Sequence, residues 1–547
     1  MSDKKWWKEG VMYQIYPRSF QDSNRDGIGD ISGIIQRLDY LESLGIDIVW
    51  LGPVYESPND DNGYDISNYY RIHPEFGTME DLEELLEGLH DRGMKLIMDL
   101  VVNHSSDEHK WFQESRKSKD NSYRDFYHWR PPAADGGPPY NWKAFFGGDA
   151  WEYDDLTGEY YLHLFTKKQP DLNWENPKLR EEIYKMMRFW LDKGVDGFRM
   201  DVISLISKPE EFENIPNDNL MYAVYNVYAN GPRVHQYLQE MNRKVLSKYD
   251  IMTVGEGPGI SKEIANDYIG KDRNELNMIF QLDLMFLDNG AGGKFDPREI
   301  TLKEFKSLFV DWDKALGDDG WNNVFLDNHD FPRMVSRWGN DGEHREASAK
   351  LLLMFLLTMR GTPCIYMGSE IGMTNVAFDD PDDYRDIETV NYFRNTKAFG
   401  GDMNHAMKMV HVQGRDNVRV PMQWDNRINA GFTDGEPWIK INPNYEDINV
   451  MSEEEKERSI LEFFRILIQW RKRDEVLQYG SYKDLDPDHS KLFLYKRELN
   501  GKERWVCLNF SDEESDIPRE IKGKRIILNN YREIGDLLKP WQAVLLK

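Results

Sequence analysis

The chain has 547 residues, of which 40% are hydrophobic and 13% aromatic, so it can bury a sizeable core and is too apolar for a disordered protein. Its formal net charge of −27 argues against binding to nucleic acid or to an anionic membrane surface, because both need basic patches. Such a charge suits a protein that acts on a neutral substrate.

The cysteines and the chain start bear on the compartment. Cys364 and Cys507 lie far apart in apolar segments, which excludes a disulfide framework and leaves too few thiols for a zinc cluster. The first residues contain no apolar stretch typical of a signal peptide, and no run of about 18 apolar residues occurs. We therefore expect a cytoplasmic protein that does not enter a membrane, and repulsion among its negative charges favours a monomer.

The first predicted strand, residues 11–20, is followed by a loop with oxygen-bearing side chains at alternate positions. This spacing is typical of a loop around a hard cation such as Ca²⁺ or Mg²⁺, and no glutamate closes a full EF-hand. The alternative is a turn held by its own Asp and Asn side chains. We favour a structural cation, with Gly27 allowing the sharp turn and these ligand positions: Asp22, Asn24, Asp26, Ile28 and Asp30.

Strand-like and helix-like segments then alternate along most of the chain. Helical periodicity is clear at residues 34–44, at 79–92 and directly before Gly194, where a glycine marks a helix stop. The predicted strands are residues 11–20, 46–53, 95–104, 195–201, 250–256, 277–283, 322–330 and 364–370. Strands that alternate with helices are parallel, with right-handed crossovers, and eight such units predict an α/β fold of the (β/α)₈ TIM-barrel type.

Two regions depart from this alternation. Residues 105–174 are irregular, with paired prolines and scattered aromatics, and predict a subdomain inserted after the third strand (domain B). Residues 479–547 carry short alternating strands and predict a C-terminal antiparallel β-domain, a β-sandwich (domain C). The barrel (domain A) then comprises residues 1–104 and 175–478.

The fourth predicted strand ends in two charged residues, Arg199 and Asp201. Residues two apart on a strand point the same way, so the cation should lie beside the carboxylate and keep it ionised. That arrangement suits a nucleophile or an electrostatic stabiliser, and the alternative is a structural ion pair.

Other predicted strands also end in polar groups, and the carboxyl ends of barrel strands carry functional residues. These groups are Asp99, His104, Glu256, His329 and Asp330. No phosphate-binding glycine motif accompanies them, so the acids favour glycosidic chemistry without a catalytic cofactor.

At this point several motifs match a known family in the right order. They are DLVVNH at 99–104, QPDLN at 169–173, GFRMDV at 197–202, VGE at 254–256, NHD at 328–330 and GRDNVRVPMQW at 414–424. Together they resemble the α-amylase superfamily (glycoside hydrolase family 13), and within it the oligo-1,6-glucosidases and related α-glucosidases. The resemblance extends over nearly the whole chain, including the C-terminal β-domain.

The resemblance implies a retaining glycosidase. Asp201 would be the nucleophile, Glu256 the general acid/base, and Asp330 the third carboxylate that binds sugar hydroxyls and stabilises the transition state. His104 and His329 would donate hydrogen bonds to the sugar, against the alternative of satisfied structural histidines. The resemblance assigns the remaining substrate contacts to Asp61, Tyr64, Gln169, Arg199, Val202 and Arg415, with Arg419 close to Arg415 in sequence.

Three positions bear on specificity. Tyr64 would stack on the sugar ring, and Asp61 with Arg415 would grip the non-reducing end, which makes such enzymes exo-acting on short substrates. Val202, after the nucleophile, is similar to the residue of relatives that prefer α-1,6 bonds, although plain strand packing would also explain it.

Two positions depart from the family pattern. Gly257 follows the acid/base where the family usually has Met, and Phe331 follows the third carboxylate where Gln is frequent. Both positions should lie near the +1 subsite.

We therefore expect a retaining exo-acting α-glucosidase that hydrolyses α-1,6 and also α-1,4 bonds of short oligosaccharides such as isomaltose. One alternative is a sucrose-acting α-glucosidase, sucrose isomerase or transglucosidase. A second is a trehalose-6-phosphate hydrolase, which would need converging basic residues near the +1 subsite. A catalytically silent relative with a carbohydrate-binding role is disfavoured, because all three carboxylates are present.

Overall fold

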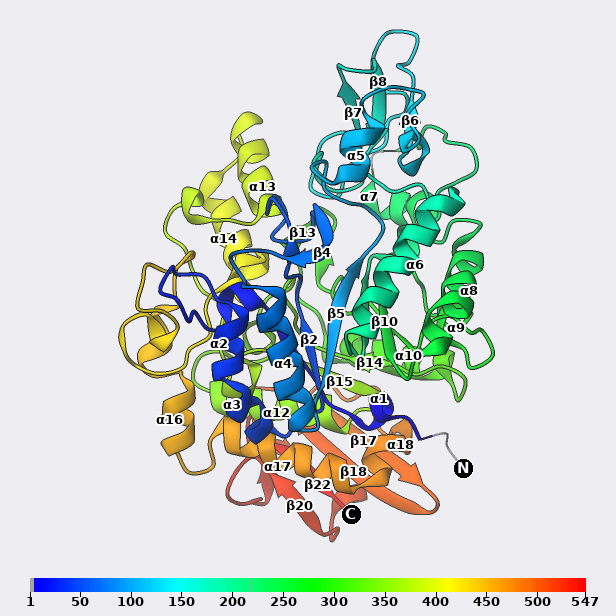
Figure 1. Cartoon of the computed structure of the whole chain (residues 1–547). Helices are drawn as coiled ribbons and strands as arrows, with labels where there is room; N and C mark the ends of the chain where they lie inside the picture. The colour runs from blue at the N-terminus through cyan, green and yellow to red at the C-terminus, as the bar shows by residue number, and fades with distance from the viewer. Residues whose placement is uncertain (1–3, 218) are drawn as a thin grey trace.

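The fold is described by a computed structural model that covers residues 4–217 and 219–547 (Figure 1). Eight parallel strands form one sheet in the order β11-β10-β9-β5-β2-β1-β15-β14, and its two ends, β11 and β14, lie in contact. The predicted (β/α)₈ barrel is therefore confirmed. Its strands are β1 (Met12–Ile15), β2 (Ile48–Leu51), β5 (Lys95–Val101), β9 (Gly197–Asp201), β10 (Met252–Glu256), β11 (Met278–Phe280), β14 (Asn323–Val324) and β15 (Thr362–Tyr366).

The register brings distant strands together at one end of the barrel. Asp99 on β5 lies opposite Arg199 on β9, and Val254 on β10 lies opposite the same arginine. Neighbouring carboxyl ends therefore deliver charged side chains to one point. This register positions the candidate site described below.

All eight barrel strands are shorter than predicted, and the first and the seventh differ most. The first ends at Ile15 because Pro17 begins a 3₁₀ turn, Pro17–Ser19, and proline cannot donate to a ladder. The seventh, β14, stops at Val324, because the residues after it leave the ladder and form a bridge between Asn328 and Phe331. The apolar residues Phe325 and Leu326 follow β14 without strand pairing.

Helices cover the outside of the barrel (Figure 1). The predicted helix at 34–44 is split into α2 and α3, and Asp30 caps α2 by accepting a hydrogen bond from the Gly33 amide at 2.6 Å. The main helices are α2 (Ile31–Gln36), α3 (Leu38–Leu44), α4 (Met79–Asp91), α6 (Pro177–Asp192), α8 (Val234–Lys244), α9 (Ala265–Ile269), α10 (Leu302–Leu316), α11 (Met334–Trp338), α12 (Arg345–Thr358) and α17 (Ile460–Arg473).

The segment between β5 and β9 folds over the carboxyl ends of the strands, at the top of Figure 1. It contains α5 (Lys110–Ser115) and an antiparallel sheet in the order β6-β8-β7, formed by Trp129–Arg130, Glu159–Leu162 and Trp151–Asp154. Another extension after β15, with α13 (Ile387–Ala398) and α14 (Met403–Gln413), rises on the other side of the same end.

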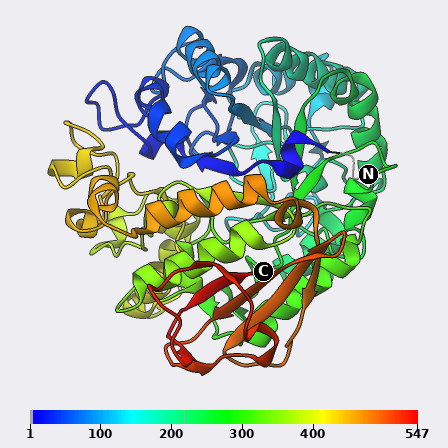
Figure 2. The same cartoon turned by 90° about the horizontal axis from the view of Figure 1, so that it is seen from below.

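The C-terminal region forms an antiparallel sheet in the order β16-β17-β18-β22-β20 at the opposite end of the barrel (Figure 2). Its strands are β16 (Ser481–Asp484), β17 (Leu492–Leu499), β18 (Lys502–Asn509), β20 (Ile526–Asn529) and β22 (Ala543–Leu546), and a two-stranded sheet pairs β19 (Ser515–Asp516) with β21 (Leu537–Leu538). Helix α12 lies in contact with α17, β18 and β22, and it is buried along nearly its whole length because it is apolar on every side.

Buried cations also attach this sheet to the barrel. Lys306 on α10 is fully buried and donates to the carbonyl groups of Asp486, His489 and Leu492. Arg497 on β17 donates to the carbonyl of Thr358 at the end of α12, where the helix dipole favours positive charge. Among residues 4–217 and 219–547, no helix has both the length and the apolar character needed to cross a membrane.

Candidate active site

Most of the predicted substrate and catalytic residues meet at the carboxyl end of the barrel. A cavity of about 170 Å³ opens there under the inserted segment. Its walls include Asp61, Tyr64, His104, Asp201, Val202, Glu256, Asp330 and Arg415. Gln169, Arg199 and His329 do not line the cavity but contact residues that do.

Arg199 is the centre of the charge network. One of its terminal nitrogens, Nη1, lies 2.7 Å from Asp99 Oδ1 and 2.7 Å from Asp201 Oδ1, and Nη2 lies 2.8 Å from Glu256 Oε2. The side chain of Arg199 is only 2% exposed. The indole of Trp50 donates a further hydrogen bond to Asp99 at 2.8 Å. One guanidinium therefore orients three carboxyl groups.

This sharing affects the protonation of the cluster. Burial raises the pKa of Asp201, Arg199 lowers it and Glu256 raises it again, with a net direction well upward. Burial likewise raises the pKa of Asp99 to about 6, against the opposing effect of Arg199. The single positive charge of Arg199 does not offset the burial of both Asp99 and Asp201, so the pKa values of these two carboxyls stay above their usual range.

Asp330 has a different environment. Its Oδ1 lies 3.1 Å from Arg415 and 2.9 Å from Arg419, and its Oδ2 lies 3.1 Å from Nε2 of His329. Burial by itself would raise the pKa of Asp330, but His329 and the two guanidinium groups lower it below its usual range. Arg415 also pairs with Asp386 at 2.6 Å. Asp330 is therefore ionised, whereas the pKa values of Asp99 and Asp201 beside Arg199 are raised.

The Asp61 side of the cavity is polar and buried. Gln169 donates to Asp61 Oδ2 at 3.1 Å, and Arg415 Nη2 lies 3.8 Å from Asp61 Oδ1. Burial raises the pKa of Asp61 to about 7, although Arg415 opposes the shift. His104 lies 3.2 Å from Gln169, and burial lowers its pKa to about 4, which keeps the ring neutral.

Lys208 was not singled out in the sequence, and it ties the inserted segment to the barrel. Its ammonium group lies 2.6 Å from Asp171 and donates to Asn103 at 2.9 Å. All three side chains are buried. The only sequence signal was a lysine in an apolar loop seven residues after Asp201, which does not reveal its partner.

Val202 has an unusual backbone. Its φ and ψ are 35° and 41°, in the left-handed region that a β-branched residue rarely occupies. In this conformation its amide donates to Glu256 Oε2 at 3.1 Å. Strain of this kind costs about 1–3 kcal/mol and is found at functional sites. The peptide after Asp201 thus orients Glu256, while the Val202 side chain lines the cavity.

The outer wall of the cavity contains residues that the sequence did not single out. Lys294 and Glu388 form an ion pair at 2.6 Å, and Phe286 lies near Phe331, with ring centroids 6.3 Å apart. All four line the cavity. Gly257 does not line the cavity, and a Cβ at this position would lie 2.8 Å from Ile260. Its neighbour Pro258 does line the cavity. Only Phe331 of the two departures therefore faces this space.

In the predicted cation loop, the side chains accept hydrogen bonds from the loop itself. Asp22 Oδ1 accepts from the amides of Asn24 and Arg25 at 2.8 Å, and Asp30 accepts from the amide of Ser23. Gly27 has a φ of 87°. Across residues 4–217 and 219–547, no group of three or more His, Cys, Asp or Glu side chains is gathered closely enough to hold a metal.

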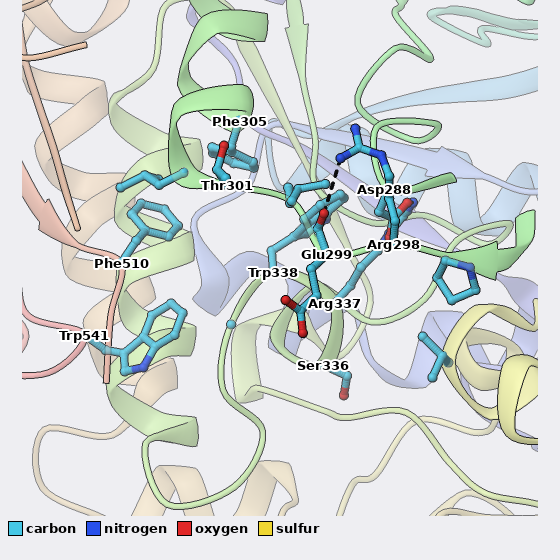
Figure 3. A pocket seen from close by; sticks show the side chains of 15 residues that line it. Asp288, Arg298, Glu299, Thr301, Phe305, Ser336, Arg337, Trp338, Phe510 and Trp541 are labelled. Carbon is cyan, nitrogen blue, oxygen red and sulfur yellow. Dashed lines mark hydrogen bonds and ion pairs between the residues drawn. The ribbon is translucent and has the colours of Figure 1, made fainter. Parts of the chain in front are cut away.

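A second and larger cavity, of about 510 Å³, lies between the barrel and the C-terminal sheet (Figure 3). Figure 3 shows Phe510 and Trp541 on one side of it and Asp288 and Arg298 on the other. The Asp288 carboxylate is already paired with Arg337. The carboxyl cluster at the strand ends lines the smaller cavity, which is therefore the candidate active site.

Comparison with known proteins gives concordant results. Residues 14–480 match the family model "Alpha amylase, catalytic domain". An oligo-1,6-glucosidase of Parageobacillus thermoglucosidasius is 55% identical over 558 residues, covering 100% of this chain and 99% of the relative.

Two solved structures are similar over nearly the full length. An isomaltulose synthase of Protaminobacter rubrum has a TM-score of 0.97 at 43% identity, covering 100% of both chains. A trehalose-6-phosphate hydrolase of Bacillus licheniformis has a TM-score of 0.95 at 42% identity, covering 99% of both.

Proposed function

The chain belongs to the alpha-amylase family, and on that premise we propose that it is a retaining, exo-acting α-glucosidase. Its substrates would be short oligosaccharides such as isomaltose, cleaved at α-1,6 bonds and less readily at α-1,4 bonds, with glucose released from the non-reducing end. The observation that carries this proposal is that Arg199 forms ion pairs with both Asp201 and Glu256. Two nitrogens of one guanidinium keep these carboxyls close together, and retaining enzymes need a separation of about 5–5.5 Å.

The proposed reaction has two steps. Glu256 donates a proton to the glycosidic oxygen while Asp201 attacks the anomeric carbon, so that the glycosidic bond breaks, the rest of the substrate leaves and a glycosyl ester forms. Glu256 then takes a proton from water, whose oxygen attacks the same carbon, breaks the ester bond and releases glucose and the Asp201 carboxylate. The mechanism requires Asp201 to attack as a carboxylate, and the guanidinium of Arg199 at 2.7 Å stabilises that charge. Asp330, ionised beside Arg415 and Arg419, would bind sugar hydroxyls and stabilise the positive charge of the transition state.

The exo-acting character is supported by the buried ion network at one side of the cavity. Arg415 pairs there with Asp386 and lies close to Asp61, and each of these side chains is less than 10% exposed. A terminal glucose ring can contact these groups with its hydroxyls, while an internal ring would have to continue into the packed protein. Tyr64, which lines the cavity, would stack on the ring.

The acceptor side supports α-1,6 cleavage over the alternatives. Val202, Lys294 and Glu388 line the cavity, and the carboxylate of Glu388 neutralises the ammonium of Lys294. A sugar phosphate would need unpaired positive charge there, so trehalose-6-phosphate hydrolysis is disfavoured. Phe331 at the same wall favours sucrose isomerisation as the second candidate, in line with the similarity to an isomaltulose synthase.

The test is a product analysis. The purified enzyme would be incubated separately with isomaltose, isomaltotriose, maltose, sucrose and trehalose-6-phosphate, and the products resolved over time. The proposal expects glucose mainly from the two α-1,6 sugars. Isomeric disaccharides formed from sucrose, with little glucose from isomaltose, would instead support the second candidate.

We also propose a structural divalent cation in the loop from Asp22 to Asp30. The residue types and their alternation fit a hard ion, with Ile28 between Asp26 and Asp30 in sequence to supply a carbonyl. The hydrogen bonds that Asp22 and Asp30 accept from the loop amides would give way to the ion. The ion would stabilise the loop and take no part in the reaction. A cytoplasmic location is likewise proposed, because Cys364 and Cys507 are free thiols, and a monomeric state is proposed on the basis of the net charge of −27.

A further inference from the structure

Gln14 is a polar residue inside the barrel. It lies on β1 beside Trp50 and Tyr366 and is 1% exposed, at a depth that TIM barrels usually fill with branched aliphatic side chains. Its Nε2 lies 2.7 Å from Nδ1 of His329. Its Oε1 is buried, and among the residues that the structure describes it has no hydrogen-bond partner. An orphaned buried oxygen of this kind calls for an explanation.

The ring of His329 is held in one plane. It is stacked against Tyr64, with centroids 5.4 Å apart, and against Tyr16, at 6.3 Å, and Trp50 meets it edge-on. Its Nε2 lies 2.8 Å from the hydroxyl of Tyr64 and 3.1 Å from Oδ2 of Asp330, two residues that line the cavity. The ring therefore cannot turn to exchange its two nitrogens.

The position of the single ring proton follows from these neighbours. Burial lowers the pKa of His329 to about 3, so the ring is neutral and carries one N–H. Asp330 is ionised between Arg415 and Arg419 and can only accept. The Tyr64 hydroxyl could donate to a bare Nε2, but the lone pair of a bare Nε2 would also face the Asp330 carboxylate, which can only accept. A proton on Nε2 removes that repulsion, and the Tyr64 hydroxyl can then accept from it. Nδ1 is then an acceptor and needs a donor, which Gln14 supplies.

We propose that Gln14 is a positioning residue that fixes the tautomer of His329, so that Nε2 presents its N–H to Asp330 and to the sugar. This role explains why Oε1 of Gln14 has no partner. If the amide were turned over, Oε1 would lie against Nδ1 of His329 and the ring proton would move to Nδ1. The charged and titratable groups around His329 are Asp330, Arg199, Arg415, Arg419, Tyr16 and Tyr64. This inference rests on the proposed function only in taking the cavity as the sugar site.

Two variants separate tautomer control from a structural role. Gln14→Leu removes the donor, and we expect kcat to fall about tenfold, the equivalent of one hydrogen bond, with a smaller change in KM. Gln14→Glu is nearly isosteric. At acid pH, either the introduced carboxyl is protonated and donates to Nδ1, or the ring is an imidazolium. In both cases Nε2 carries its N–H. As the pH rises, the carboxylate draws the proton to Nδ1, so kcat should fall along a new alkaline limb that the parent enzyme lacks.

The matched control is Gln542→Leu, which removes a buried glutamine and its hydrogen bond to Asn529 in the C-terminal sheet. It should leave kcat and its pH profile unchanged. Each enzyme would be assayed on isomaltose and on p-nitrophenyl α-glucoside, with melting temperatures to confirm folding. Parent-like kcat in Gln14→Leu, or a parent-like pH profile in Gln14→Glu, would overturn the proposal.

With two variants, the role of Gln14 can be decided even if one of them does not fold. If Gln14→Leu does not fold, the pH profile of Gln14→Glu decides. If the parent enzyme leaves isomaltose intact, the proposed substrate is wrong, while the comparison on p-nitrophenyl α-glucoside still tests Gln14.

Discussion

Replacing Arg199 by Met should destabilise the protein strongly, and more so as the pH rises. Arg199 is 2% exposed and contacts Asp99, Asp201 and Glu256 at 2.7–2.8 Å. Removing one partner of a buried ion pair leaves an uncompensated charge and costs about 3–5 kcal/mol of unfolding free energy. Activity should be lost as well, because Asp201 and Glu256, the proposed nucleophile and acid/base, lose their common ion-pair partner.

The pH dependence follows from proton uptake. The pKa of Asp99 is already raised to about 6 with Arg199 present, and removal of the guanidinium raises the carboxyl pKa values further. The folded variant then binds about one proton more than the folded parent above pH 6. Its stability relative to the parent should therefore fall by about 1.4 kcal/mol for each pH unit over that range.

The assay is urea unfolding of both proteins at pH 5.5 and pH 8, followed by tryptophan fluorescence. Arg337→Met is a useful control, since Arg337 is equally buried but pairs with Asp288 outside the site. We expect this control to be destabilised without loss of the catalytic geometry. A deficit for Arg199→Met below about 1 kcal/mol, or one that is the same at both pH values, would refute the reasoning.

Three further predictions concern single groups. Asp201→Asn should lower kcat by about 10³-fold or more while the melting temperature is unchanged or higher, because a like charge is removed; substantial turnover would show that Asp201 is not the nucleophile. Asp61→Asn should gain stability relative to the parent between pH 4 and pH 7. The pKa of Asp61 is raised to about 7 in the folded state, so in this range the carboxyl ionises in the unfolded parent but not in the folded one, and the parent loses stability as the pH rises. Melting temperatures at pH 5 and pH 8 measure the gain. Chelation of divalent cations should lower the melting temperature, and Ca²⁺ at about 100 times its dissociation constant should restore about 2.7 kcal/mol in the parent but not in Asp22→Ala; an unresponsive parent would count against the cation.

Much of the fold can be predicted from local sequence patterns. The alternation of strand and helix patterns predicts the barrel because each period records which face of a segment is buried. The boundaries are less accurate, as the first and seventh strands show, because proline chemistry and side-chain bonds end a ladder where the apolar pattern continues.

The chemistry of single strand ends is also local. Arg199 and Asp201 are two residues apart on one strand, so the sequence alone predicts that they are neighbours. The polar ends of the other strands follow from the same reasoning, since barrel topology delivers them to one face. The sequence thus determined the barrel, the end of the barrel that carries the site and the residue types there.

Tertiary structure decided which charges meet and which of them hold protons. Arg199 is shared with Asp99 and Glu256, Asp330 is held by Arg419 as well as Arg415, and Gln14 reaches His329 across the barrel. These contacts join residues up to 315 positions apart, and they exist only once the barrel closes. The pKa values depend on burial and on the sum of all nearby charges, and neither quantity is recorded in the spacing of one segment.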